Sequence, residues 1–171
     1  RLVAIAWAHT ARGFASPTHS PLVKATLQGI RRTCGRTVRQ VAALQKAQVL
    51  RMVHGLHGMR GLRDRALLLV GFAGALRRSE LVALNIDDVQ FNEEGMVLHL
   101  RRSKTDQTGL GRNVAIPRVR GRHCPCRCLS DWLKVSGITA GAIFRPVTRY
   151  EQVLSHRPSA QSAPLVIKRH A

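Results

Sequence analysis

The feature that most restricts the fold of this 171-residue chain is an unbroken apolar run of eleven residues, from Ala66 to Leu76. A helix that is apolar on every side is stable only where other elements surround it. The run is well short of the roughly 20 residues that a membrane-spanning helix needs. It therefore predicts a buried central helix in a folded domain, and no membrane span.

Helical spacing of apolar residues extends on both sides of this run. Ser20-Pro21 has the residues of a helix start, because serine caps the first turn and proline is tolerated at its first position. The glycines from Gly58 to Gly61 are expected to separate two helices. The expected helices cover residues 2–9, 20–30, 49–56, 63–76, 81–84 and 128–135, with a last one beginning at residue 162.

The spacing of apolar residues changes after residue 95, from the helical spacing to alternation. Apolar and other residues alternate over residues 96–101 and again over 114–116, which predicts two antiparallel strands. A polar loop, residues 103–111, separates them, and residues 142–147 are expected to be extended. The expected fold class is therefore α+β, mainly helical with a small antiparallel sheet.

The charge is strongly one-sided, with 28 Lys and Arg residues against 9 Asp and Glu, a formal net charge of +19. Such an excess predicts an anionic partner, and nucleic acid first, because Lys and Arg neutralise backbone phosphates. Aromatic residues make up 4% of the chain, which disfavours a single-strand binder that stacks bases. A ribosome-associated or other RNA-binding protein is also compatible with this charge.

Four cysteines do not make a disulfide framework in a chain of this length, so a reducing cytoplasm is the expected location. Residues 1–8 superficially imitate a secretion signal, but their apolar stretch is too short, and we expect a buried helix there. His123, Cys124, Cys126 and Cys128 resemble a zinc set without its paired Cys-x-x-Cys spacing. Arg127 among them would repel a cation, and no metal is expected.

A charged segment follows the apolar run directly, in Gly74-Ala75-Leu76-Arg77-Arg78-Ser79-Glu80-Leu81. In one interpretation Arg77 and Arg78 merely complement the negative end of the helix dipole. In the other, one arginine binds a phosphate through two parallel hydrogen bonds, and Glu80 orients its guanidinium. Lys104, in the polar loop, is either a solvated surface charge or a proton donor to a leaving alkoxide.

Together these segments resemble the tyrosine recombinase (phage integrase) family. The resemblance rests on the arginine segment and on the loop lysine that follows it between two strands. The matching residues are Arg63-Asp64-Arg65-Ala66-Leu67-Leu68-Leu69, Gly74 to Leu81, Asp87-Asp88-Val89, Ser103-Lys104-Thr105-Asp106 and Val114-Ala115-Ile116-Pro117.

The resemblance implies a role for each matching residue. Arg77 corresponds to the family's first catalytic arginine, which holds the scissile phosphate of double-stranded DNA, and Glu80 to a supporting acid. Lys104 corresponds to the general acid for the leaving 5′ oxygen. The family forms a 3′-phosphotyrosyl intermediate without metal, cofactor or small-molecule substrate, and a full-length parent is expected to assemble as a tetramer on paired DNA sites.

The resemblance also implies a division of the chain. Residues 1–32 correspond to the end of a helical core-binding domain and residues 46–171 to the first part of a catalytic domain. Residues 33–45 are expected to be a basic linker, since the whole stretch from Arg31 to Arg39 is basic and weakly periodic. The family's His-x-x-Arg box and terminal tyrosine are not matched, and Tyr150, the single tyrosine, precedes their expected place.

We therefore expect a truncated catalytic domain that is inactive alone. The alternative is a non-catalytic DNA-binding module left from a degraded integrase. Seven arginines are expected to contact the DNA backbone, although each group could also be an ordinary solvated face. They are Arg31, Arg32, Arg36, Arg39, Arg101, Arg102 and Arg112. Arg118, Arg120 and Arg122 are weaker candidates of the same kind.

Overall fold

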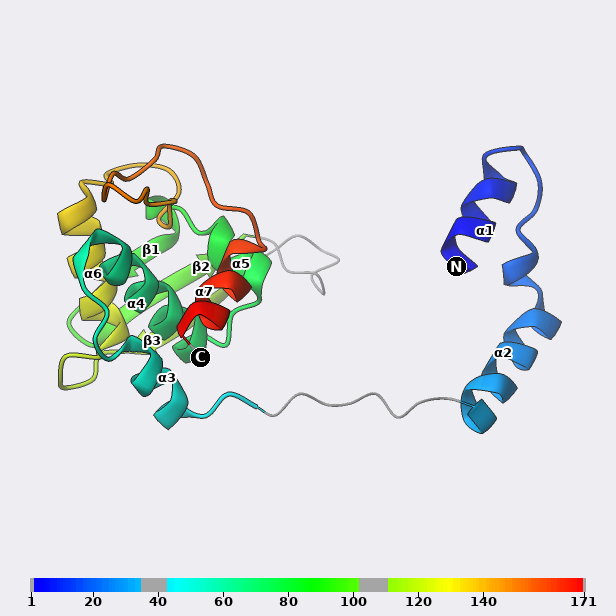
Figure 1. Ribbon diagram of the computed structural model, residues 1–171, viewed down its shortest axis with the longest axis horizontal. Helices are drawn as coiled ribbons and strands as arrows, with labels where there is room; N and C mark the ends of the chain where they lie inside the picture. Colours follow the sequence, from blue (N-terminus) through cyan, green and yellow to red (C-terminus); the bar gives the residue numbers. More distant parts are fainter. Residues whose placement is uncertain (1, 35–42, 102–110, 171) are drawn as a thin grey trace. The chain divides into compact units, whose positions relative to one another are not determined.

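The structure, a computed structural model, describes residues 2–34, 43–101 and 111–170. Contacts divide the chain into two compact units, Arg1–Ala43 and Leu44–Ala171. The first unit holds α1 (Leu2–Thr10), the 3-10 helix η1 (Pro17–His19) and α2 (Pro21–Cys34). The second unit holds α3 (Lys46–Val53), α4 (Gly58–Ala73), α5 (Arg78–Ala83), η2 (Ile86–Asp88), β1 (Val89–Phe91), β2 (Gly95–Leu100), β3 (Arg112–Pro117), α6 (Pro125–Ser136) and α7 (Ser162–His170) (Figure 1).

The first unit has helices without a buried core. Neither α1 nor α2 contains a buried residue, and Val3 is 82% and Trp7 73% exposed. The expectation of a buried first helix is therefore wrong for the described residues. The physical reason is that α1 is apolar around its circumference, while a 3-10 turn and one further helix can cover little of it.

The second helix starts as predicted and ends later than predicted. It begins at Pro21 and continues to Cys34, four residues beyond the expected end, so that Arg31 and Arg32 lie in its last turn. Basic side chains stabilise this end of a helix because its carbonyl groups carry partial negative charge.

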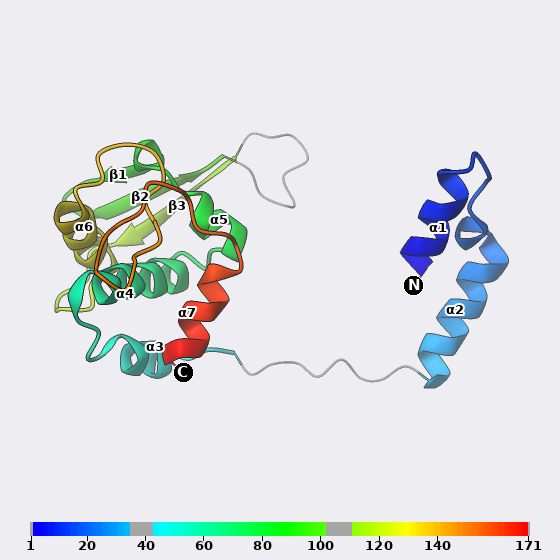
Figure 2. The same cartoon turned by 45° about the horizontal axis from the view of Figure 1, so that its top comes forward.

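The second unit is built around α4. Figure 2 shows α4 running beneath the three strands, with α3 and α7 on its other side, and α6 also packs against it. The largest fully buried side chains include Trp132 of α6, Leu98 of β2 and Phe144. The Nε1–H of Trp132 donates to the carbonyl of Ile143 at 2.9 Å, so the indole is both buried and satisfied.

The sheet confirms the α+β prediction. Its strands are antiparallel in the order β1-β2-β3, and Leu98 of β2 lies opposite Val89 of β1 and Val114 of β3. Met96, Leu98 and Leu100 are buried while His99 between them is exposed, as the alternation predicted. The extended segment expected over residues 142–147 forms isolated bridges only at its two ends, Ala142 with Asn85 and Val147 with Val153.

The start of α4 differs from the prediction. The helix begins at Gly58 and not after Gly61. A Cβ at Gly61 would lie 2.7 Å from the backbone carbonyl carbon of Leu56, so this glycine allows the incoming loop to approach the helix closely. Gly61 is therefore needed for close backbone packing and does not break the helix.

The end of α4 also differs. The apolar run is buried from Ala66 to Val70, but Phe72 is 41% exposed and the helix ends at Ala73. The amide of Leu76 donates to Gly71 O at 3.0 Å and that of Ala75 to Phe72 O at 3.2 Å, the hydrogen bonds of a Schellman motif. Ala75 has φ +47° there, although glycine is usual, and this turn leads the chain directly to Arg77.

The cysteines near the start of α6 are buried thiols. Cys126 Sγ donates to Ile116 O at 3.5 Å, and Cys128 Sγ donates to Arg122 O at 3.3 Å. Burial raises the pKa of each of these thiols to about 11.

Among the described residues no group of three His, Cys, Asp or Glu side chains could hold a metal ion. In the same part of the chain no helix is long and apolar enough to cross a membrane.

Thiol reactivity tests this arrangement. Cys34 is exposed, whereas Cys124, Cys126 and Cys128 are 2%, 1% and 4% exposed. At pH 8 we expect one thiol per native chain to react rapidly with an aromatic disulfide reagent, and Cys34→Ser to abolish that phase. The other three should react only after unfolding in guanidinium, and a second fast thiol in the native protein would contradict the burial.

Candidate functional site

The arginine segment begins α5 immediately after the turn that ends α4. Arg77 is the N-cap residue of α5 and Glu80 is the third residue of that helix. The amide of Arg77 donates to Glu80 Oε2 at 2.8 Å, and its guanidinium Nη1 donates to Oε1 at 2.9 Å. Glu80 therefore caps the helix and orients the arginine at once, since an acidic third residue accepts from the N-cap amide.

The carboxylate of Glu80 also holds an arginine from the sheet. Nη2 of Arg112, the first residue of β3, lies 3.3 Å from Oε2. The Glu80 side chain is 2% exposed, while those of Arg77 and Arg112 are 45% and 47% exposed. A buried acid thus orients two guanidinium groups that are partly exposed to solvent.

The next short helix repeats this device. Asp88, the last residue of η2, is 4% exposed and accepts from the amide of Asn85 at 2.9 Å. Its other oxygen accepts from Nε of Arg101 at 2.5 Å. Arg101 directly follows β2, so the two described arginines at this end of the hairpin, Arg101 and Arg112, each pair with a buried carboxylate. Glu80, Asp88 and Arg101 line a hollow of about 310 Å³ together with Leu84 and His99.

The site is positively charged and faces solvent. Three arginines (Arg77, Arg101 and Arg112) and two carboxylates (Glu80 and Asp88) give a formal charge of 3 − 2 = +1. Guanidinium groups are planar multiple donors that match the oxygens of a phosphate. This arrangement can therefore bind a phosphate group between α5 and the hairpin.

A fourth arginine, Arg157, lies at the edge of this site. Its Nη1 donates to Val82 O at 2.5 Å and its Nη2 to Asn85 Oδ1 at 2.6 Å. Arg157 was not among the residues predicted from the sequence, in which no segment after Lys104 matches the family's His-x-x-Arg box. No sequence signal connects it to α5, because the contact spans 75 residues.

A separate buried acid attaches α7 to α4. Asp64 is 1% exposed and accepts from Arg63 Nε at 2.7 Å, and His170 Nε2 lies 3.0 Å from its other oxygen. Arg169 Nη1 lies 3.7 Å from that same oxygen. This cluster positions α7 and is distinct from the arginines around Glu80.

The predicted site residues have different outcomes. Arg77, Glu80, Arg101 and Arg112 come together, whereas Arg31 and Arg32 belong to the other unit. The predicted residues Arg36, Arg39, Arg102 and Lys104 lie outside the described residues. Tyr150 is 69% exposed, and the guanidinium of Arg149 lies 4.7 Å from its ring centroid. The catalytic and DNA-contact roles stay predictions.

Replacement of Glu80 tests whether its ion pairs with Arg77 and Arg112 stabilise the site. Glu80→Gln removes the charge that pairs with both arginines, and we expect it to cost about 1–3 kcal/mol in the free energy of unfolding, the range for a lost charged hydrogen bond. Glu94→Gln makes the same charge change at an exposed position and should cost less than about 0.5 kcal/mol. Urea denaturation measures both, and equal losses would contradict the role assigned to Glu80.

Known proteins provide an independent comparison. No protein-family model matches the sequence. It is similar to the integrase/recombinase xerD homolog of Selenomonas ruminantium, with 35% identity over 176 residues. The match covers 99% of this chain and 52% of the relative, so the chain spans about half the length of that protein. Because the similarity runs through nearly the whole chain, including the arginine segment, the chain belongs to the tyrosine recombinase (phage integrase) family.

Proposed function

We propose that this chain provides the DNA-binding and phosphate-holding part of a site-specific recombinase. The observation that carries the proposal is the pairing of buried Glu80 with Arg77 and Arg112. A fixed guanidinium that needs no rearrangement stabilises developing charge better than a free one. Glu80 supplies that fixation, and the partly exposed guanidinium of Arg77 is proposed to bind the non-bridging oxygens of a DNA phosphate.

The proposed reaction is that of the family. A tyrosine oxygen attacks the phosphorus, the bond to the 5′ oxygen breaks, and the strand remains attached through a 3′-phosphotyrosyl bond. Arg77 binds the phosphate, Arg112 and Arg101 add positive charge beside it, and Lys104 gives its proton to the leaving 5′ oxygen. The complete protein is proposed to work as a tetramer on two paired sites.

The nucleophile is proposed to lie outside residues 1–171. Tyr150 is the only tyrosine in this sequence, and its described contacts are with Arg149 and Thr148, not with the Glu80 cluster. Residues 1–171 alone are therefore proposed to bind DNA without cutting it. A non-catalytic DNA-binding module left from a degraded integrase is the second candidate, favoured by the same position of Tyr150.

Salt dependence tests the DNA-binding proposal. Affinity for a duplex should fall steeply with salt, with a log–log slope of about −0.9 for each phosphate contact. Arg77→Gln should make that slope shallower by about 0.9 and leave most of the affinity, because many other arginines remain. Arg127→Gln removes the same charge from α6 at a side chain that is 68% exposed, and should leave the slope unchanged. Fluorescence anisotropy over a salt series measures the slope, and salt-independent binding would refute the proposal.

A suicide substrate tests the proposed lack of cleavage. We expect residues 1–171 to form no covalent adduct with a nicked duplex that traps the phosphotyrosyl intermediate. Denaturing electrophoresis of labelled DNA reveals such an adduct. If one forms and Tyr150→Phe abolishes it, Tyr150 is the nucleophile and the assignment is wrong. A longer form of the protein that carries a further tyrosine would separate the two candidates, because only a recombinase forms the adduct.

A further inference from the structure

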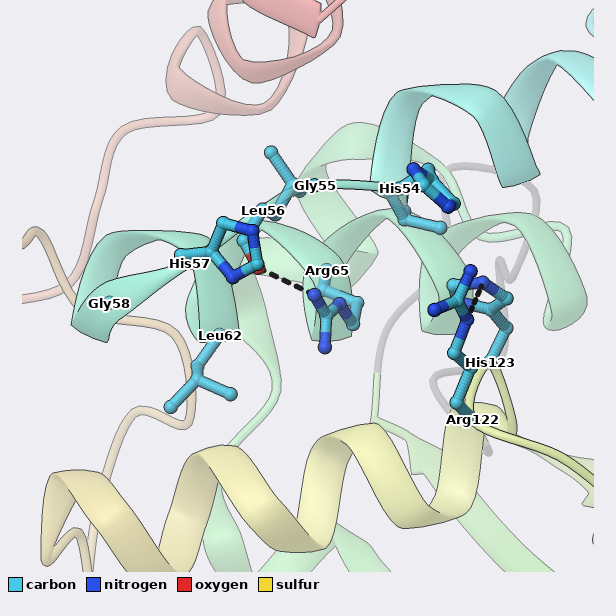
Figure 3. A pocket seen from close by; sticks show the side chains of 10 residues that line it. His54, Gly55, Leu56, His57, Gly58, Leu62, Arg65, Arg122 and His123 are labelled. Carbon is cyan, nitrogen blue, oxygen red and sulfur yellow. Dashed lines mark hydrogen bonds between the residues drawn. The ribbon is translucent and has the colours of Figure 1, made fainter.

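A second hollow lies at the other end of α4 from Arg77. It has a volume of about 430 Å³ and is formed by the loop between α3 and α4, the first turns of α4 and the loop before α6. Figure 3 shows Arg65 between His57 and the pair formed by Arg122 and His123. Five of its lining side chains are basic and none is acidic: His54, His57, Arg65, Arg122 and His123.

Two buried nitrogen atoms in this pocket lack a protein partner. Arg65 donates through Nη2 to Leu56 O at 2.5 Å, but its Nε is buried and unpaired. Nε of Arg122 donates to Nε2 of His123 at 3.1 Å. A guanidinium nitrogen can only donate, so Nε2 accepts and the neutral imidazole carries its proton on Nδ1. That Nδ1–H is the second buried donor without a partner among the described residues.

Two unpaired donors in one pocket require an acceptor. Each buried unsatisfied donor costs about 1–3 kcal/mol, which a ligand oxygen would recover. Both groups donate, so a ligand that only accepts hydrogen bonds fits them.

The charge of the pocket selects an anion. Arg65 and Arg122 are permanently positive. Burial, together with the positive charges of Arg122 and Arg65 and the nearby His54, lowers the pKa of His123 below its ordinary value. A metal cation would meet the same repulsion, so three histidines here do not make a metal site.

The start of α4 adds to this preference. Gly58, its first residue, lines the pocket, and a helix N-terminus favours negative charge. An exposed carboxylate, that of Glu151, already approaches Gly58: a Cβ at Gly58 would lie 2.0 Å from its Oε1. The two buried donors of Arg65 and His123 nevertheless stay unpaired in its presence.

We propose that this pocket binds a phosphate group, with Arg65 Nε and His123 Nδ1 donating to its oxygens and Arg122 supplying charge. The group is either free phosphate or a backbone phosphate of DNA, which have the same acceptor chemistry. None of these residues takes part in the cluster around Glu80, so the pocket is a site separate from the proposed phosphate clamp and does not depend on it.

Binding of inorganic phosphate is the first test. Calorimetry at pH 7 and low salt should detect phosphate binding in which this pocket accounts for one site per chain, in addition to any binding at the cluster around Glu80. Arg122→Gln and His123→Gln should each weaken it about tenfold, the equivalent of about 1.4 kcal/mol. Arg127→Gln, with the same loss of charge as Arg122→Gln, should stay within about twofold of the parent. Because Arg122 is exposed, its replacement leaves the core intact, which circular dichroism checks.

A second readout reports on the pocket itself. The bound anion offsets the positive charges around His123, so phosphate should raise the pKa of this imidazole. Nuclear magnetic resonance titration of the histidine ring protons measures that change, and His123→Gln identifies the signal. Phosphate attracted to the surface as a whole would shift the exposed histidines equally and would count against the site.

Binding to a DNA duplex distinguishes the two sources of phosphate. If free phosphate does not bind, but Arg122→Gln weakens duplex binding more than Arg127→Gln does, a DNA backbone phosphate occupies the pocket. If both pocket variants match the control with phosphate and with duplex, the proposal is overturned. Failure of the Glu80 clamp would instead appear with Arg77→Gln, so the two proposals fail independently.

Discussion

The interaction on which the candidate site depends is the buried carboxylate of Glu80. It accepts from the amide and the guanidinium of Arg77 and lies within reach of Arg112. One side chain thereby joins the turn after α4, the start of α5 and the start of β3. A charge this deeply buried is tolerated because it is paired and hydrogen-bonded. The same pairing turns two flexible arginines into fixed donors at the protein surface.

Two further acids of the second unit act in the same way as Glu80. The chain has 9 acidic residues against 28 basic ones, and three of them, Asp64, Glu80 and Asp88, are almost fully buried. Each contacts at least one arginine and connects elements that are distant in sequence, or caps a short helix. These three negative charges therefore act inside the protein and connect its elements, while other acids, such as Glu94, are exposed. Such a distribution suits an anionic partner because little of the outer field is cancelled.

Helix α4 places the two proposed phosphate sites at its opposite ends. Its C-terminal turn, a Schellman motif with Ala75 in the left-handed conformation, delivers Arg77 to the cluster around Glu80. Its first turns help to form the pocket of Arg65 and His123. The buried middle of the helix, from Ala66 to Val70, holds both ends at a fixed separation within the unit, because a packed helix is stiff.

The sequence by itself determined what depends on near neighbours. Alternation located β2 and β3, helical spacing located most helices, and the three-residue interval between Arg77 and Glu80 predicted their contact. The net charge predicted an anionic partner, because charge is additive along a chain. Three-residue β1 was missed, since it is too short to show a period and exists through its pairing with β2.

Only the tertiary structure decided what depends on distant segments. Glu80 meets Arg112 across 32 residues and Val82 meets Arg157 across 75. The pocket of Arg65 and His123 likewise combines separate segments of the chain. Packing also decided that the apolar run is buried only as far as Val70, with Phe72 exposed. Such contacts follow from packing in three dimensions, in which residues far apart in sequence share one environment, and no local period of the sequence records them.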